Sequence, residues 1–181
     1  MAVVFSARGG RWAPVVGLAL AGCAPAAGPD ATLLRTDFEQ LAGWGPADAF
    51  LTTERAHSGR YAMRVPAGQE FAGNYRAPLG SVCAFVPTRL RLQSWVYLPS
   101  GRSRDTQLVV QVLCHGRRPD VWRALAVDLV VQRYQKWERV FKYIRLPAGL
   151  DPSDELQVYV WHSDPAGEPT YFDDLTVEGW R

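Results

Sequence analysis

Two stretches of this 181-residue chain alternate aromatic and hydrogen-bonding side chains at a spacing of two residues. They are Arg91, Gln93, Trp95 and Tyr97, and Gln157, Tyr159 and Trp161. A pyranose ring offers an apolar C–H face that stacks on an aromatic ring and hydroxyls that exchange hydrogen bonds, so these residue types suit a glycan. If both stretches share one sheet, we expect a face that is aromatic in its middle and polar at its edge. The alternative is that the aromatics lie under a covering loop or only form cross-strand pairs, because period two does not say which face is solvated.

Catalytic groups are sparse by comparison. The three histidines lie in turn-like contexts, and no serine lies in a Gly-x-Ser-x-Gly nucleophile elbow. A glycosidase would need two carboxylates about 5 to 10 Å apart across a cleft. Four acids at expected strand ends or in loops could supply such a pair, namely Asp128, Glu138, Glu155 and Asp164. Any chain with 18 acidic residues would offer similar candidates, so these four carry little evidence for an enzyme. The sequence therefore predicts a binding protein without enzyme activity.

The N-terminal segment has the features of a bacterial lipoprotein signal. Arg8 and Arg11 form a charged region, and residues 13–20 form an apolar run that is too short to span a bilayer. The segment Leu20-Ala21-Gly22-Cys23 resembles the lipobox, in which cleavage precedes the cysteine and its thiol is acylated. The alternative is a short buried helix with a chance cysteine.

The lipobox implies that the chain has three regions. We expect a signal peptide over 1–22, a flexible tether over 23–31 that begins with lipidated Cys23, and a folded domain over 32–181. The expected location is the bacterial cell envelope. Ala24 stands where an aspartate is associated with inner-membrane retention, which favours the outer membrane and leaves cell-surface display open.

Processing would also change the charge balance. The whole chain has 20 Lys+Arg and 18 Asp+Glu; two of the arginines and none of the acids lie within 1–22, so 18 of each remain. Binding to a phosphate backbone depends on clustered Lys and Arg, which this balanced chain lacks. We therefore expect no nucleic-acid partner.

Cys83 and Cys114 remain as an even pair if Cys23 is acylated. The envelope permits disulfides, but a disulfide needs Cα atoms within about 7 Å, which the sequence does not reveal. The sequence is compatible with either a Cys83–Cys114 disulfide or two buried thiols on separate strands.

From residue 32 onward the chain has the pattern of consecutive strands. Most apolar runs alternate with polar residues and end at Gly, Pro, Ser or Asp. The expected strands are 33–38, 50–54, 61–65, 70–76, 89–98, 107–114, 121–128, 138–146, 155–161 and 170–178. No convincing helical stripe interrupts them. The pattern predicts an all-β fold, a single antiparallel β-sandwich or jelly roll.

Six short motifs follow one another at domain-length spacing. They are Asp37-Phe38-Glu39, Gly43-Trp44, Ala56-His57-Ser58-Gly59-Arg60-Tyr61, Leu92-Gln93-Ser94-Trp95-Val96-Tyr97-Leu98, Trp137-Glu138-Arg139-Val140 and Tyr171-Phe172-Asp173-Asp174-Leu175. In this order they resemble the galactose-binding-like jelly rolls of the carbohydrate-binding-module type. The resemblance is more specific for fold than for function, because this fold hosts sugar binding, protein contacts and structural roles.

The resemblance also implies a structural calcium ion near the joined ends of the domain. Many members of such families hold it with an acid of the first strand, carbonyls of the His-Ser-Gly turn and an aspartate of the last strand. The corresponding residues are Glu39, with Asp37 as a substitute acid, Ser58 and Asp173. Calcium takes about six to eight oxygen ligands, which two segments and a turn can supply. The alternative is that these acids only end strands and cap a turn, where Gly59 fits a residue with positive φ.

Together these observations predict a lipid-anchored, non-catalytic carbohydrate-binding module that recognises a glycan or polysaccharide by stacking and hydrogen bonds. The alternative is a structural or protein-interaction β-sandwich of the bacterial envelope with no sugar site and an envelope protein as its partner. Exposure of the aromatics on one face distinguishes the two. Trp44 and Trp122, next to turns, are expected at the rim of a site, and Trp137 is expected in the core.

Overall fold

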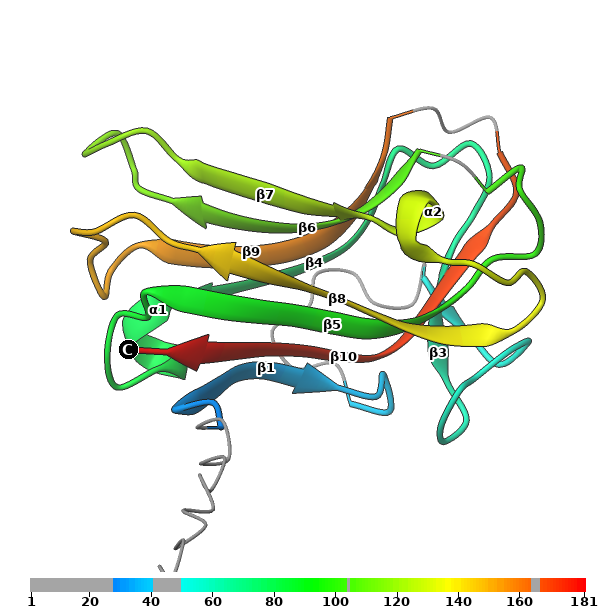
Figure 1. The fold of residues 1–181 in the computed structure, drawn as a ribbon, viewed down its shortest axis with the longest axis horizontal. Coiled ribbons are helices and arrows are strands. Elements are labelled where there is room, and N and C mark those ends of the chain that lie inside the picture. The colour runs from blue at the N-terminus through cyan, green and yellow to red at the C-terminus, as the bar shows by residue number, and fades with distance from the viewer. Residues whose placement is uncertain (1–27, 41–49, 104, 164–166) are drawn as a thin grey trace, which may run out of the picture.

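A computed structural model describes residues 28–40, 50–103, 105–163 and 167–181, which form two packed antiparallel sheets (Figure 1). The elements are β1 Ala31–Thr36, β2 Leu51–Thr52, β3 Ala62–Val65, β4 Phe71–Pro78, α1 Leu79–Val82, β5 Arg89–Tyr97, β6 Thr106–Leu113, β7 Val121–Ala126, α2 Val127–Val130, β8 Trp137–Arg145, β9 Glu155–His162 and β10 Thr170–Trp180. The predicted all-β sandwich is confirmed. The predicted signal peptide, Cys23, Trp44 and Asp164 lie outside the described residues.

Sheet A is built around β10. The sheet runs in the order β2-β3-β10-β5-β8, and β1 also pairs with β10. The start of β10, Thr170–Phe172, pairs with β3, and its later part pairs with β1 along the same edge. Its other edge pairs with β5. One long strand therefore joins early, middle and late segments of the chain.

Sheet B runs in the order β4-β9-β6-β7. Strands β5 and β9, which carry the two aromatic alternations, thus belong to different sheets, because β5 pairs with β8 and β10 whereas β9 pairs with β4 and β6. The single aromatic face that we considered from the sequence does not form. Each alternation instead lies on the outer face of its own sheet.

The core lies between the sheets and is filled by every second residue of each strand. These inward side chains are 0 or 1% exposed and include Leu90, Leu92 and Val96 of β5, Leu108, Val110 and Val112 of β6, Leu156, Val158 and Val160 of β9, and Phe172, Leu175 and Val177 of β10. Burying this apolar surface supplies the main driving force for folding. Cys83 and Cys114 are also buried, as free thiols.

The two ends of the sandwich domain lie side by side (Figure 1). Asp30 N–H donates to the Gly179 carbonyl at 2.9 Å, and the Arg181 N–H donates to Asp30 Oδ2 at 2.9 Å. Both described helices have four residues. Within the described ranges, no helix is long and apolar enough to cross a membrane.

Candidate ligand-binding faces

The aromatics of β5 are covered by the loop between β2 and β3. The His57 ring stacks on Trp95, with centroids 3.9 Å apart and planes 16° apart. Tyr97 is 8% exposed, and the Arg55 guanidinium lies 4.6 Å from its ring centroid. Trp137, expected in the core, is half-buried on this outer face, where the register places it opposite Tyr97. A sugar therefore has no free stacking surface on Trp95 or Tyr97.

Two adjacent aspartates of β10 hold the covering loop in place. Asp173 is fully buried, and its Oδ2 accepts the N–H groups of His57 at 2.7 Å and Ser58 at 3.0 Å. Asp174 accepts the Ser58 hydroxyl at 2.8 Å and contacts His57 Nδ1 at 2.6 Å. Asp174 has φ of 46° and lies where β10 shifts register against β5. This bulge turns both carboxylates toward the same loop.

Glu39 fastens the same turn from the side of β1. Its Oε1 accepts the N–H groups of Arg60 at 2.7 Å and Tyr61 at 2.6 Å. Gly59 has φ of 58°, as expected, and a Cβ at this position would lie 2.5 Å from Glu39 Oε1. Glycine is needed here for two reasons, the left-handed backbone and the close carboxylate.

The residues that the resemblance assigns to calcium have hydrogen-bond donors at their oxygens. Glu39 and Asp173 face N–H groups, and the Ser58 hydroxyl points at Asp174. Burial raises the pKa of Asp173 above its usual value. Among the described residues, no group of three or more His, Cys, Asp or Glu is placed to hold a metal. This arrangement does not fit an ion, and calcium binding by Asp37, Glu39, Ser58 and Asp173 stays a prediction.

The outer face of sheet B carries a contiguous set of four aromatic side chains, here called the aromatic patch. Its members are Phe71 of β4, Trp122 of β7, and Tyr159 and Trp161 of β9. Phe71 is 49% exposed and Trp122 is 40% exposed. Ring centroids are 6.1 Å apart for Phe71 and Tyr159, and 5.8 Å for Trp122 and Trp161. Unlike the aromatics of β5, this patch includes rings that reach solvent.

Hydrogen bonds fix the rings of the aromatic patch. Trp122 Nε1–H donates to the Tyr159 hydroxyl at 3.0 Å, which itself donates to Gln111 Oε1 at 2.9 Å. Trp161 Nε1–H donates to Glu70 Oε1 at 3.4 Å. Ring orientations set in advance reduce the entropy that is lost on binding.

Polar side chains lie in register beside the patch. Asn74 of β4 is opposite Tyr159, and Arg76 of β4 is opposite Gln157 of β9. The Asn74 Oδ1 is buried and has no hydrogen-bond partner among the described residues. Gln157 lies on this face but is buried and donates to Glu155 at 2.6 Å, so it does not present an exposed polar edge. A buried acceptor without a partner is costly, and a hydroxyl donor that reached Asn74 would remove this cost.

The patch contains residues that the alternation pattern did not identify. Trp122 was expected at a rim, and its exposure agrees with that expectation. Phe71 is a lone aromatic at the start of β4, and only its pairing opposite Trp161 brings it into the patch. On sheet A, Arg91 forms an ion pair with Glu178 at 2.5 Å, and Gln93 lines a separate cavity.

Among the solved structures that share this fold are three carbohydrate-binding modules. The CBM22-1 xylan-binding domain of Paenibacillus barcinonensis Xyn10C is 20% identical, with a TM-score of 0.56 over 84% of this chain and 97% of that one. The C-terminal family 22 carbohydrate binding module of Clostridium thermocellum Xyn10B is 16% identical, with a TM-score of 0.56 over 84% and 96%. A family 16 carbohydrate binding module is 16% identical, with a TM-score of 0.52 over 75% and 90%.

Sequence comparison adds no assignment, since neither a protein-family model nor a curated protein matches this chain. At these low identities, the structural likeness defines the fold. The chain is a β-sandwich of the kind found in carbohydrate-binding modules of families 16 and 22.

Proposed function

We propose that this protein is a non-catalytic carbohydrate-binding module and that the aromatic patch of sheet B is its glycan-binding surface. The observation that carries the proposal is the contiguity of four rings on one sheet face, two of them well exposed and three held by hydrogen bonds. A polysaccharide presents the matching surface, because its sugar rings are apolar on their faces and polar around their edges.

The polar neighbours of the patch suit a glycan better than a wholly apolar partner. Asn74 offers an unpartnered acceptor, and Arg76 is an exposed donor on the same face. Such groups orient a ligand that the rings attract without strong directional preference. Three of the structural neighbours are described as xylan-binding, so a xylan oligosaccharide is a suitable first probe.

Isothermal titration of the protein with xylohexaose, a ligand present in one related xylanase structure, tests the proposal. We expect Trp161→Ala to weaken binding about 30-fold, because a central tryptophan commonly contributes about 2 kcal/mol to an interface. Tyr134→Ala is the matched control, since Tyr134 is 49% exposed and lies outside the patch. An affinity for xylohexaose that Trp161→Ala leaves unchanged would contradict the proposed site.

Anchoring through an acylated Cys23 is part of the same proposal. It rests on the Leu20-Ala21-Gly22-Cys23 motif and the apolar run before it. Expression of the full chain in bacteria should place it in the membrane fraction of the envelope, and Cys23→Ser should release it or leave its precursor uncleaved. Membrane association and processing that do not change in Cys23→Ser would refute the lipid anchor and leave the glycan site unaffected.

Calcium can be tested on the same protein without reference to glycan. If an ion binds Glu39 and Asp173 after rearrangement of the turn, excess calcium should raise the thermal midpoint relative to protein in EDTA, because a ligand that binds only the folded state stabilises it. Equal midpoints in the two solutions would argue against the calcium site.

A further inference from the structure

We propose that the outer face of sheet A carries a second saccharide site, made by Phe141 and the polar cavity beside it, and that it binds a neutral sugar unit. This site lies on the opposite face of the sandwich from the aromatic patch. The proposal therefore stands or falls independently of the sheet B site.

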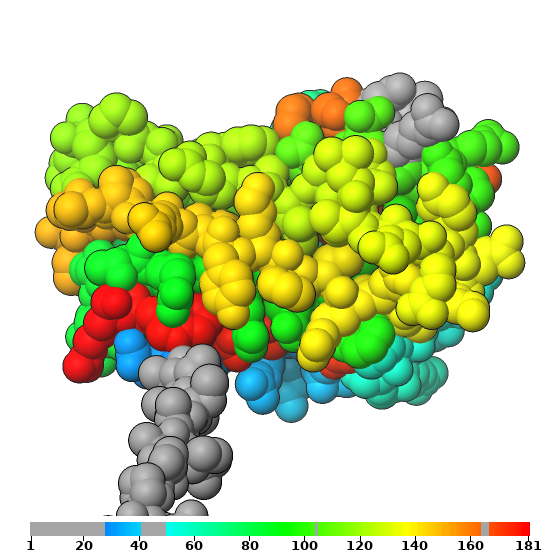
Figure 2. Space-filling model, in the orientation of Figure 1, coloured from blue at the N-terminus to red at the C-terminus, as the bar shows by residue number. Residues whose placement is uncertain are grey.

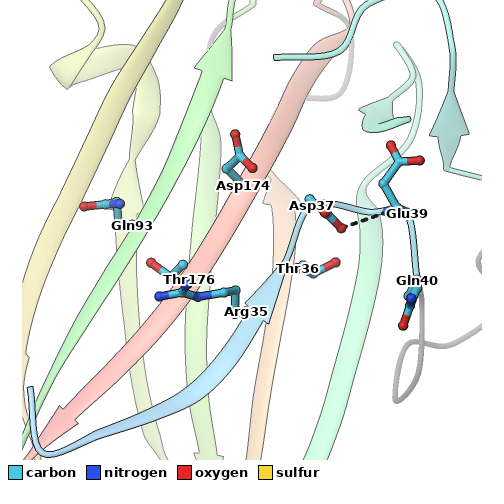
Figure 3. Close-up of a pocket in the computed structure, with 8 residues that line it drawn as sticks. All are labelled: Arg35, Thr36, Asp37, Glu39, Gln40, Gln93, Asp174 and Thr176. Carbon is cyan, nitrogen blue, oxygen red and sulfur yellow. Dashed lines mark hydrogen bonds between the residues drawn. The ribbon is translucent and has the colours of Figure 1, made fainter. Parts of the chain in front are cut away.

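The polar half of the site is a cavity of about 530 Å³. Arg35, Thr176 and Gln93 line it from β1, β10 and β5, and Figure 3 shows them side by side across these three strands. The Thr176 Oγ1 is buried and has no hydrogen-bond partner among the described residues. Asp37 lines the cavity beyond the end of β1 (Figure 3). The cavity thus offers donors and acceptors close together.

The stacking half of the site is Phe141 on the neighbouring strand β8. Strand register forms one row from Arg35 through Thr176 and Gln93 to Phe141. Adjacent strands are about 4.8 Å apart, so Phe141 is the neighbour of Gln93, a cavity-lining residue, on the same face of the sheet. Phe141 is 53% exposed. In the space-filling view, the side chains of β8 (yellow) stand at the front of the molecule without a covering segment (Figure 2).

A second exposed ring extends the stacking surface along β8. Tyr143 is 51% exposed, and its centroid lies 6.0 Å from that of Phe141 in an edge-to-face arrangement. The Arg89 guanidinium lies 5.5 Å from the Tyr143 ring, and Trp180 contacts the ring at 5.8 Å. Tyr143 is therefore packed between Phe141, Arg89 and Trp180. Two successive outward residues of one strand thereby present a short aromatic strip.

The charges around the cavity select the kind of sugar. Three carboxylates, those of Asp37, Glu39 and Asp174, line it together with the Arg35 guanidinium. Inside the cavity an anionic sugar would meet more negative than positive charge, which disfavours it; Arg89, the cation beside Tyr143, is not among the residues that line the cavity. A neutral sugar can donate hydroxyl protons to a carboxylate, accept from Arg35, and exchange hydrogen bonds with Gln93 and Thr176.

The position of the two sites has a consequence for binding stoichiometry. The outer faces of the two sheets point away from each other, with the core between them. Because the sites face opposite sides, a short oligosaccharide that fills one cannot reach the other. The protein should bind two short oligosaccharides at once and join two glycan chains when the chains are long.

The test is an NMR titration of the ¹⁵N-labelled full chain with xylohexaose, cellohexaose and mannohexaose. With at least one of them, we expect saturable shifts of the Gln93, Thr176 and Phe141 amides. Phe141→Ala should weaken the affinity obtained from these shifts at least tenfold, whereas Trp161→Ala should leave this affinity unchanged. Leu129→Ala is the control for loss of exposed apolar surface, since Leu129 is 81% exposed in α2.

The two proposals fail in distinguishable ways. The second site is overturned if none of the three oligosaccharides shifts these sheet A amides, or if Phe141→Ala leaves the shifts intact. The sheet B site is overturned if no oligosaccharide shifts the Tyr159 and Trp161 amides, or if Trp161→Ala leaves the affinity for xylohexaose unchanged. A binding stoichiometry of two that falls to one in either single variant supports both sites.

Discussion

The outer faces of the two sheets share the same sequence pattern of alternating aromatics but differ in whether these aromatics are covered. On sheet A, Trp95 and Tyr97 lie beneath His57 and Arg55. On sheet B, the aromatic patch with Trp161 has no such cover within the described residues, and part of it is well exposed. The difference comes from the β2–β3 loop, which Asp173 and Asp174 attach to sheet A. Period two sets the direction of a side chain, and contacts distant in sequence decide whether it meets solvent.

The largest expected effect is a difference in stability between variants of the two faces. Trp95→Ala should lower the free energy of unfolding by about 2 to 3 kcal/mol, because the ring packs under the covering loop and its loss leaves a gap. Trp161→Ala on the open face should cost less than about 1 kcal/mol. Urea unfolding of both variants measures the contrast. Equal losses would mean that the two faces are not covered differently.

A second substitution loosens the cover without touching an aromatic ring. Asp173→Asn should destabilise the protein by about 2 kcal/mol. The carboxylate accepts N–H groups at both oxygens, those of His57 and Ser58 at Oδ2 and that of Asp174 at Oδ1, whereas an amide has one acceptor oxygen and would turn its NH2 group toward a donor. Thermal unfolding provides the measurement, and near-ultraviolet circular dichroism should report a freer Trp95. Asp30→Asn is the control, since Asp30 is an exposed acceptor for Arg181. An unchanged midpoint would show that Asp173 does not hold the loop.

Acid should act on sheet B through His162 at the end of β9. Burial lowers the pKa of His162 below its usual 6.5. The unfolded chain therefore takes up a proton near pH 6.5 while the folded chain does so only at lower pH, and stability falls as the pH drops through this window. The slope is at most about 1.4 kcal/mol per pH unit.

Urea unfolding between pH 7.5 and 5.5 measures this decline. His162→Leu should remove the contribution of His162, whereas His115→Asn, at an exposed turn with φ of 50°, should retain it. The same decline in His162→Leu as in the unchanged protein would assign the effect to another group.

The smallest expected effect is a change in xylohexaose affinity after substitution of Trp122 on the open face. Trp122→Phe keeps an aromatic ring but removes the Nε1–H that donates to the Tyr159 hydroxyl. This hydrogen bond lies within the protein, so its loss acts on binding only through a less fixed ring and should weaken xylohexaose binding by about fivefold at most, equivalent to about 1 kcal/mol. Trp122→Ala should weaken binding further. Equal effects of the two substitutions would indicate that the ring contributes nothing beyond its hydrogen bond.

Local patterning was enough to predict the strands and the all-β class. Alternation alone places Leu90, Leu92 and Val96 together on one face of β5, and Tyr159 and Trp161 together on one face of β9. The sheet to which each strand belongs did not follow, because pairing is set by contacts between segments far apart in sequence. Phe71 was missed for this reason. The prediction that Trp137 lies in the core was wrong, because a lone aromatic before a strand does not indicate which face of the sheet it occupies.

Strand β10 also constrains how the protein is made. Residues 170–180 complete the pairing of β1, β3 and β5, so sheet A has no central strand until this segment leaves the ribosome. Until then β1 lacks its partner, and nascent β5 has one unpaired edge. Pairing across such long sequence separations is slow, and exposed edges favour association with other chains. The nascent protein should therefore depend on protection of these edges until residues 170–180 have been synthesised.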